Sequence, residues 1–133
     1  MRIIFSLSVC FSVLALTGCD ENPGRVHAER EQLFGVYETK FDRGTERLEL
    51  KRDGIYVQEF TAAEASFRHT GKWAYDDPFV GGTDVVLVDA VLSEDQGTAP
   101  HEIGERTLNV HRRSGKLALT KNEVADWYYE RVD

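Results

Sequence analysis

The chain is poor in proline and in cysteine, the residue that forms disulfide cross-links. Its 133 residues include two cysteines and three prolines, and both cysteines, Cys10 and Cys19, lie near the N-terminus. The rest of the chain has no thiol for a disulfide, so its stability must come from the core alone. The length suits one domain, and no internal repeat or low-complexity segment divides it.

Motifs for the common catalytic chemistries are missing as well. The sequence has no Gly-x-Ser-x-Gly elbow, phosphate-binding glycine loop or dinucleotide fingerprint. Its nearest approach to a zinc motif starts at His101, but Glu105 stands where the second histidine ligand should be. Pro100 and Gly104 also argue against the helix that such a motif needs. We expect a solvated loop there, no catalytic residues, and neither a metal nor another cofactor.

Positively charged residues are outnumbered by negatively charged ones. The formal net charge is −7, and the basic runs stop at Arg112-Arg113. This balance disfavours nucleic acid and anionic lipid headgroups as partners. It favours a basic partner or simple solubility.

The one long apolar run lies at the N-terminus. Arg2 precedes an apolar stretch over residues 3–16, which is too short for a comfortable membrane span. The stretch ends in Leu16-Thr17-Gly18-Cys19. This ending resembles the lipobox of bacterial lipoproteins, where small residues fit the peptidase groove and the thiol accepts the lipid. An ordinary secretory signal and an uncleaved anchor helix are the competing interpretations.

The lipobox resemblance implies a specific maturation and location. Residues 1–18 would be a signal peptide that is removed, and Cys19 would become the acylated first residue in the cell envelope. Asp20 would act as a sorting signal that favours the periplasmic face of the inner membrane, with the outer membrane as the alternative. Without residues 1–18 the chain keeps 15 Lys and Arg against 23 Asp and Glu, a formal net charge of −8.

The acylated chain divides into a linker and a domain. We assign residues 19–32 to the lipidated cysteine with a short linker, and residues 33–133 to a β domain. Residues 20–25 are polar, and fully extended they reach only about 20 Å, so the domain should lie against the bilayer. Residues 26–33 predict about two turns of helix.

From Leu33 onward the sequence alternates with the period of β-strands. The turn Arg52-Asp53-Gly54 predicts a tight hairpin. Residues 85–92 are apolar on both faces, which predicts a strand covered on both sides. The polar residues 93–105 predict a loop. The predicted strands cover residues 33–40, 47–51, 55–60, 67–75, 85–92 and 107–111, a segment around Leu117 and Leu119, and residues 127–132.

These strands predict an all-β fold, a small antiparallel up-and-down meander that closes into a barrel of about eight strands. Four short segments resemble the small lipocalin-like domains of bacterial lipoproteins, a likeness that spans residues 33–132. It implies that the first and last strands are neighbours and that Arg131 packs on the ring of Tyr37. The four segments are Gly35-Val36-Tyr37, Arg52-Asp53-Gly54-Ile55-Tyr56, Gly71-Lys72-Trp73 and Tyr129-Glu130-Arg131.

Alternation also orients the histidines and aromatic residues. His69 should point inward as a hydrogen-bonded core histidine, with a ligand-binding or pH-sensing role as the alternative. His111 should face outward from its strand. Because neighbours on a strand face opposite ways, at least one aromatic residue among 127–129 must lie outside. Asp76-Asp77 is typical of an acidic turn, with an acid pair or a calcium loop as alternatives.

Three functions are compatible with this sequence. The leading hypothesis is a non-enzymatic, membrane-tethered envelope module that binds a protein, for example an immunity or inhibitor protein against a basic toxin. The alternative is a lipocalin-like carrier of a small apolar ligand, with Tyr56, His69 and Trp73 facing the ligand. An enzyme assembled from distant loops comes third.

Overall fold

A computed structural model of the chain describes residues 24–42, 44–63, 66–92, 102–122 and 127–133. The predictions made for the signal peptide, for Cys19 and Asp20, and for His101 lie outside these residues.

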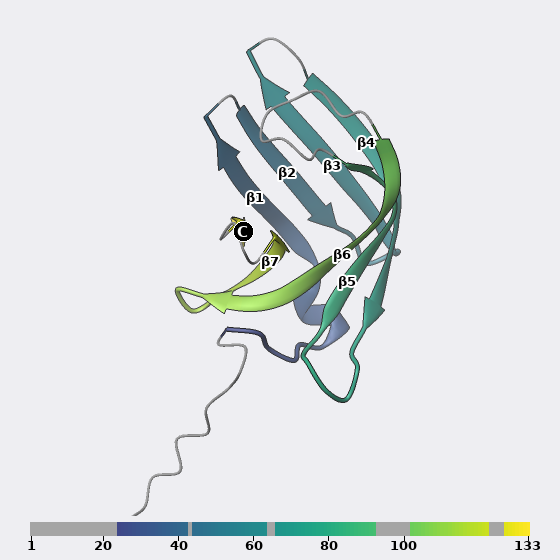
Figure 1. The fold of residues 1–133 in the computed structure, drawn as a ribbon, viewed down its shortest axis with the longest axis vertical. Helices are drawn as coiled ribbons and strands as arrows, with labels where there is room; N and C mark the ends of the chain where they lie inside the picture. The colour runs from purple at the N-terminus through teal and green to yellow at the C-terminus, as the bar shows by residue number, and fades with distance from the viewer. Residues whose placement is uncertain (1–23, 43, 64–65, 93–101, 123–126) are drawn as a thin grey trace, which may run out of the picture.

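Eight β-strands make up most of the described chain, as Figure 1 shows. They are joined in an antiparallel meander, and each strand pairs with the next along the chain. A single four-residue 3₁₀ helix, η1, precedes them. The elements are η1 (Arg30–Leu33), β1 (Gly35–Phe41), β2 (Gly44–Leu50), β3 (Ile55–Ala62), β4 (Ser66–Asp76), β5 (Asp84–Leu92), β6 (Glu102–Arg113), β7 (Lys116–Asn122) and β8 (Trp127–Arg131).

Pairing of β1 with β8 closes the sheet into a barrel. The all-β, up-and-down barrel predicted from the sequence is therefore confirmed, and it is consistent with a lipocalin-like barrel. We call the end that carries η1 and the β6–β7 turn the lower end. The upper end is the one where β1 leads into β2 and β3 leads into β4 (Figure 1).

The lower half of the barrel holds the apolar core. Inward-facing residues of β1, β2, β4, β5, β6 and β7 are fully or nearly fully buried there, because period-2 alternation turns one face of each strand inside. The core includes Leu33, Tyr37, Leu48, Leu50, Trp73, Val85, Leu87, Leu108, Val110, Leu117 and Leu119.

Arg131 fastens the closing pair of strands at the lower end. Its guanidinium carbon lies 5.8 Å from the centre of the Tyr37 ring, so the predicted contact is confirmed. Arg131 also donates to the carbonyl oxygens of Gln32 at 2.6 Å and Phe34 at 2.5 Å. Gly35 makes room for this contact, since a Cβ there would lie 2.7 Å from Arg131 Nη2. The last strand is thereby tied to the turn that enters the first.

Of the two turns of helix predicted over residues 26–33, the structure has only the 3₁₀ helix over Arg30–Leu33, and residues 26–29 are not helical. The backbone N–H of Arg112 donates to the carbonyl of Gly24, and that of Val26 donates to the carbonyl of Val110. Thr83 in turn donates to the carbonyl of Val26. Because the β5–β6 ladder begins only at Asp84, the lower edge of β6 is free to pair with this segment, and the pairing overrides local helix propensity.

Three further expectations need correction. The strand β6 begins at Glu102, inside the predicted loop over residues 93–105. The outer face of β5 is not covered, because Val88 is 40% exposed. His111 occupies an outward position on its strand but is only 4% exposed. The Tyr128 ring, 5.2 Å away, and the backbone at Gly24 cover it.

Candidate functional site in the upper barrel

The residues predicted to face a ligand share one face of the sheet but not one site. Along β4 the inward positions, including His69 and Trp73, are less exposed than their neighbours, as alternation predicted. Trp73 belongs to the lower core, where its indole nitrogen donates to the carbonyl of Lys51 at 2.9 Å. Tyr56 and His69 lie together, with ring centres 6.1 Å apart.

Tyr56 and His69 both bind the backbone of an irregular part of β5. The β5–β6 register shifts between Leu87 and Ala90, and Asp89 in this bulge has a positive φ of 53°. Tyr56 Oη donates to the carbonyl of Val88 at 2.8 Å. His69 Nε2 lies 2.6 Å from the carbonyl oxygen of Asp89. Side chains from β3 and β4 thus support the bulge. His69 points inward and is hydrogen-bonded as predicted, but it is only partly buried and is not part of the core.

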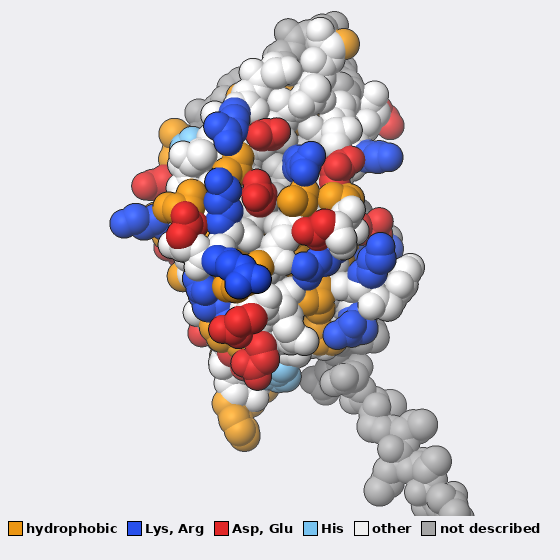
Figure 2. All heavy atoms as spheres, turned by 180° about the vertical axis from the view of Figure 1, so that it is seen from behind, with side chains coloured by type: hydrophobic (Ala, Val, Ile, Leu, Met, Phe, Trp, Pro, Cys, Tyr) orange, Lys and Arg blue, Asp and Glu red, His pale blue; other side chains and the backbone are white. Residues whose placement is uncertain are grey.

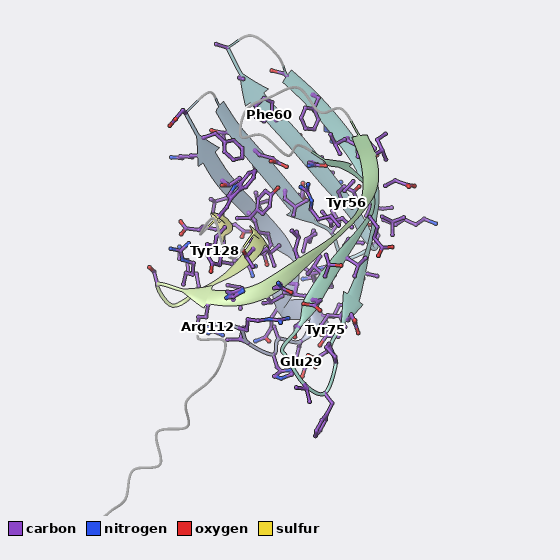
Figure 3. The ribbon with its side chains drawn as sticks, viewed as in Figure 1. Glu29, Tyr56, Phe60, Tyr75, Arg112 and Tyr128 are labelled. Atoms are coloured by element: carbon purple, nitrogen blue, oxygen red, sulfur yellow. The ribbon has the colours of Figure 1, made fainter. Side chains whose placement is uncertain are left out.

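A glycine makes the Tyr56 contact feasible. The Tyr56 ring passes over Gly71 on the neighbouring strand, and a Cβ at Gly71 would lie 2.5 Å from Tyr56 Oη. The aromatic ring covers the backbone that glycine leaves bare, a known device in twisted sheets. Figure 3 shows Tyr56 and Phe60 on the same strand, with Phe60 nearer the upper end.

Sequence reasoning missed a polar group in the middle of the barrel. We name Glu46, Gln58 and Tyr129 the interior polar cluster; all three are buried. Gln58 Nε2 donates to Glu46 Oε1 at 2.6 Å, and Tyr129 Oη donates to the same oxygen at 2.8 Å. The signal was available in the alternation, because Glu46 continues the inward series of Leu48 and Leu50.

Gln58 joins the cluster to the β5 bulge. Its amide nitrogen donates to the carbonyl of Val91, and its amide oxygen accepts from the backbone N–H of Val91, both at 3.2 Å. Burying polar groups is tolerated when their partners are also inside. The cluster and the bulge therefore form one hydrogen-bonded unit across β2, β3, β5 and β8.

Burial keeps the phenols of this unit protonated. The pKa of Tyr129 is raised well above its ordinary value, first by burial and then by the Glu46 carboxylate, while the nearby Arg106 charge acts in the opposite direction. Burial, and then the charge of Asp89, raises the pKa of Tyr56 to about 12. Both side chains are hydrogen-bond donors at neutral pH.

Four aromatic residues lie next to the interior polar cluster, on its side towards the upper end of the barrel. Phe41 contacts Trp127 edge to face at 4.7 Å between ring centres, and Phe60 stacks on Phe67 at 5.6 Å. Phe41 and Phe60 join the two pairs at 6.4 Å. Of residues 127–129, Trp127 and Tyr129 are buried and Tyr128 lies outside against His111, which confirms that these neighbours cannot all point inward.

The remaining candidate chemistry is accounted for by local contacts. Asp77 Oδ1 accepts from Thr83 Oγ1 and lies 2.7 Å from His27 Nδ1, as expected of an acidic turn. Among the residues that the structure describes, no three His, Cys, Asp or Glu side chains are grouped to hold a metal ion. In the same residues, no helix is long and apolar enough to cross a membrane.

No family model, curated protein or solved structure matches this chain. The function must therefore be argued from its own residues.

One outer surface combines apolar and acidic side chains. We name Val88, Asp89, Ile103 and Glu105 the β5–β6 outer patch; all four are exposed, Ile103 by 66%. Ile103 lies opposite Val91, and Glu105 lies opposite the bulge, between the pairs Leu87–Arg106 and Ala90–Gly104. The interior polar cluster supports this patch from behind, through Gln58 and Val91.

Proposed function

We propose that the protein is a lipid-anchored envelope protein whose barrel acts as a non-enzymatic protein-binding module. The interior polar groups already bind one another and the backbone, and this observation supports the proposal most directly. Recognition inside the barrel would have to break these buried hydrogen bonds, which is costly. Recognition on the outer wall leaves them intact.

The β5–β6 outer patch is the proposed contact surface. Two exposed apolar side chains beside two carboxylates suit a partner with apolar and basic groups. A formal net charge of −8 after loss of residues 1–18 speeds capture of such a partner through electrostatic attraction. An immunity or inhibitor protein against a basic toxin or hydrolase would have this character.

The anchor belongs to the same proposal and rests on Leu16-Thr17-Gly18-Cys19. Residues 1–18 are removed, Cys19 carries the lipid, and Asp20 favours the inner membrane. Growth with labelled palmitate tests this directly. We expect labelled protein from the native sequence and none from Cys19→Ala; an unlabelled native protein contradicts the anchor.

The binding role is tested by cross-linking in intact envelopes. We expect a partner that is captured by the native protein and lost in Ile103→Asp. Lys40→Asp, at an exposed position on β1, is the matched control and should retain the partner. Capture of no partner above background, or equal capture by Ile103→Asp, contradicts the proposed surface.

A carrier function is the second candidate, and one observation favours it. Among the described residues, Arg106 Nη1 is a buried nitrogen for which the structure provides no hydrogen-bond partner. A small apolar ligand with one acceptor atom could satisfy it beneath the aromatic residues of the upper end. Extraction of the purified protein with organic solvent, followed by mass spectrometry, should then release a ligand that Arg106→Met does not retain.

A further inference from the structure

The loop between β4 and β5 carries the most exposed apolar side chains of the described chain. Phe79 is 99% exposed and its neighbour Val80 is 79% exposed. We name these two residues the apolar tip. Figure 2 shows apolar side chains at the lowest point of the described molecule, the end where Figure 1 places this loop.

The base of the loop is firmly held, so the tip projects from a fixed support. Thr83 is fully buried, and its Oγ1 accepts from the N–H of Ala28 at 2.8 Å and donates to Asp77 Oδ1 at 2.8 Å. The N–H of Thr83 donates to the carbonyl of Val26. Gly82 has a φ of 88°, and a Cβ there would lie 3.1 Å from the Val26 carbonyl oxygen. The body of the protein cannot fold back over the tip without breaking these contacts.

The loop base is bound to the same segment that leads to the lipid. Residues 24–28 contact the loop through Val26, Ala28 and His27. Cys19 lies five residues before Gly24 in the sequence, so their Cα atoms are at most about 18 Å apart. Acyl chains on Cys19 would bring the bilayer within reach of the apolar tip.

The shape and chemistry of the tip suit a bilayer better than a protein. Phe79 and Val80 lie on a projecting loop, whereas the β5–β6 outer patch lies on the continuous wall of two paired strands, where neighbouring side chains can complete the roughly 800 Å² per partner of a stable protein interface. A bilayer surface accepts small convex insertions, and burial of phenylalanine and valine at its acyl boundary is favourable. The charges around the tip do not form a basic patch, because Asp76 and Asp77 precede it and Arg25, which lies beside Gly81, is paired with Asp84.

We propose that Phe79 and Val80 insert into the bilayer that holds the Cys19 lipid. This inference rests on the proposed lipid anchor and adds to it a second membrane contact. An acyl tether alone leaves the body free to swing, whereas two contacts fix its orientation. The lower end then faces the membrane, and the upper end of the barrel points away from it.

Tryptophan fluorescence in vesicles tests this insertion. The acylated protein, which begins at Cys19 under this proposal, is purified from envelopes with Phe79→Trp and placed in phosphatidylcholine vesicles with brominated acyl chains. The native Trp73 and Trp127 are buried in the barrel and give a constant background. We expect the indole at position 79 to shift to shorter wavelength and lose roughly half of its emission, because side chains at this depth lie about 5–10 Å into the boundary.

Lys40→Trp provides the matched control, because residue 40 is exposed near the upper end of β1. Its indole should show neither the shift nor the quenching. Equal quenching at positions 40 and 79, or none at 79, overturns the insertion. A shift at 79 that depends on protein concentration and not on brominated lipid also overturns it, since a second copy would then cover the tip.

Mass spectrometry of the same samples separates the two proposals. Protein without an acyl chain on Cys19 contradicts the anchor, and with it the basis for insertion. Acylated protein without quenching at position 79 leaves the anchor standing and contradicts the insertion alone.

Discussion

The two halves of the barrel bury similar aromatic side chains, but the polar groups of these side chains find different hydrogen-bond acceptors. In the lower half, aromatic side chains donate to the backbone of the segments that close the end: Tyr37 to Leu33, Tyr75 to Ala28 and Trp73 to Lys51. In the upper half, side chains serve as acceptors as well: Tyr129 donates to Glu46 and Trp127 donates to Thr39, whereas Tyr56 donates to the backbone of Val88.

This difference separates a fixed part of the molecule from an adjustable one. Backbone acceptors cannot be changed by substitution, so the lower half constrains how the chain ends are closed. Side-chain acceptors can be exchanged without altering the fold. The upper half is therefore where substitutions can rearrange the interior hydrogen bonds while the pairing of the strands stays the same.

The largest effect is expected in the lower core. Leu50→Ala removes a buried side chain and leaves a cavity among packed strands, which should lower the free energy of unfolding by about 2–5 kcal/mol. Urea denaturation followed by fluorescence measures it. Thr61→Ala, at an exposed position on β3, should change it by less than about 0.5 kcal/mol. A loss below about 1 kcal/mol for Leu50→Ala would show that the lower core is not the main source of stability.

High pH should destabilise both halves. Burial raises the pKa of both Tyr37 and Tyr56 to about 12, so the folded protein holds these protons more tightly than the unfolded chain. Their contribution is fully present below an ordinary pKa of 10.0 and is lost as pH rises towards about 12.

Both tyrosines should contribute to this loss, Tyr37 by on the order of 2 kcal/mol. Urea unfolding at a series of pH values measures it. Tyr37→Phe and Tyr56→Phe should each flatten the pH dependence relative to the native protein. An unchanged profile in both variants would assign the alkaline loss to other groups.

The interior polar cluster should behave as a coupled unit. Glu46→Leu leaves the donors of Gln58 and Tyr129 without their shared acceptor, at a cost of about 1–3 kcal/mol. The double variant Glu46→Leu/Tyr129→Phe removes one orphaned donor, so it should cost less than the sum of the single variants, with a coupling of about 1 kcal/mol or more. Strict additivity of the three unfolding free energies would mean that the two side chains act independently.

The smallest effect is expected on the outer wall. Arg68 and Glu59 form an ion pair at 3.1 Å with both side chains well exposed. Arg68→Ala should change the unfolding free energy by less than about 0.5 kcal/mol, because solvent screens such pairs. A loss above about 1 kcal/mol would indicate that the outer wall contributes as much as the polar interior.

Sequence alternation predicted the barrel well because, within each strand, apolar residues mark the face that points inside and polar residues mark the face that points outside. The pairs Leu48–Leu50 and Leu117–Leu119 define the inner face without help from the rest of the chain. The contact of Arg131 with Tyr37 was also predicted, although it joins the two ends of the domain. It came from a resemblance, since no local pattern in the sequence indicates which distant strands meet.

The misses arose where contacts between distant segments override the local pattern. Residues 24–26 pair with a free edge of β6 instead of starting a helix, and the sequence of the segment itself does not reveal that edge. His111 is buried for the same reason. Glu46 is a different case: its inward position follows from the alternation of Leu48 and Leu50, but the predicted strand began at Arg47, and the local sequence does not show that Gln58 and Tyr129 supply partners for a buried carboxylate.

Closure by the final strand has a consequence for how the chain is made. Every pairing from β1 to β7 joins neighbours in sequence, whereas the β1–β8 pairing and the Arg131 contacts join segments nearly one hundred residues apart. A chain that is synthesised from its N-terminus can form an open sheet early. The unpaired edges of β1 and β7 then stay available for wrong partners until residues 127–131 are added. Loss of these few terminal residues would therefore leave a nearly complete sheet that is prone to aggregation.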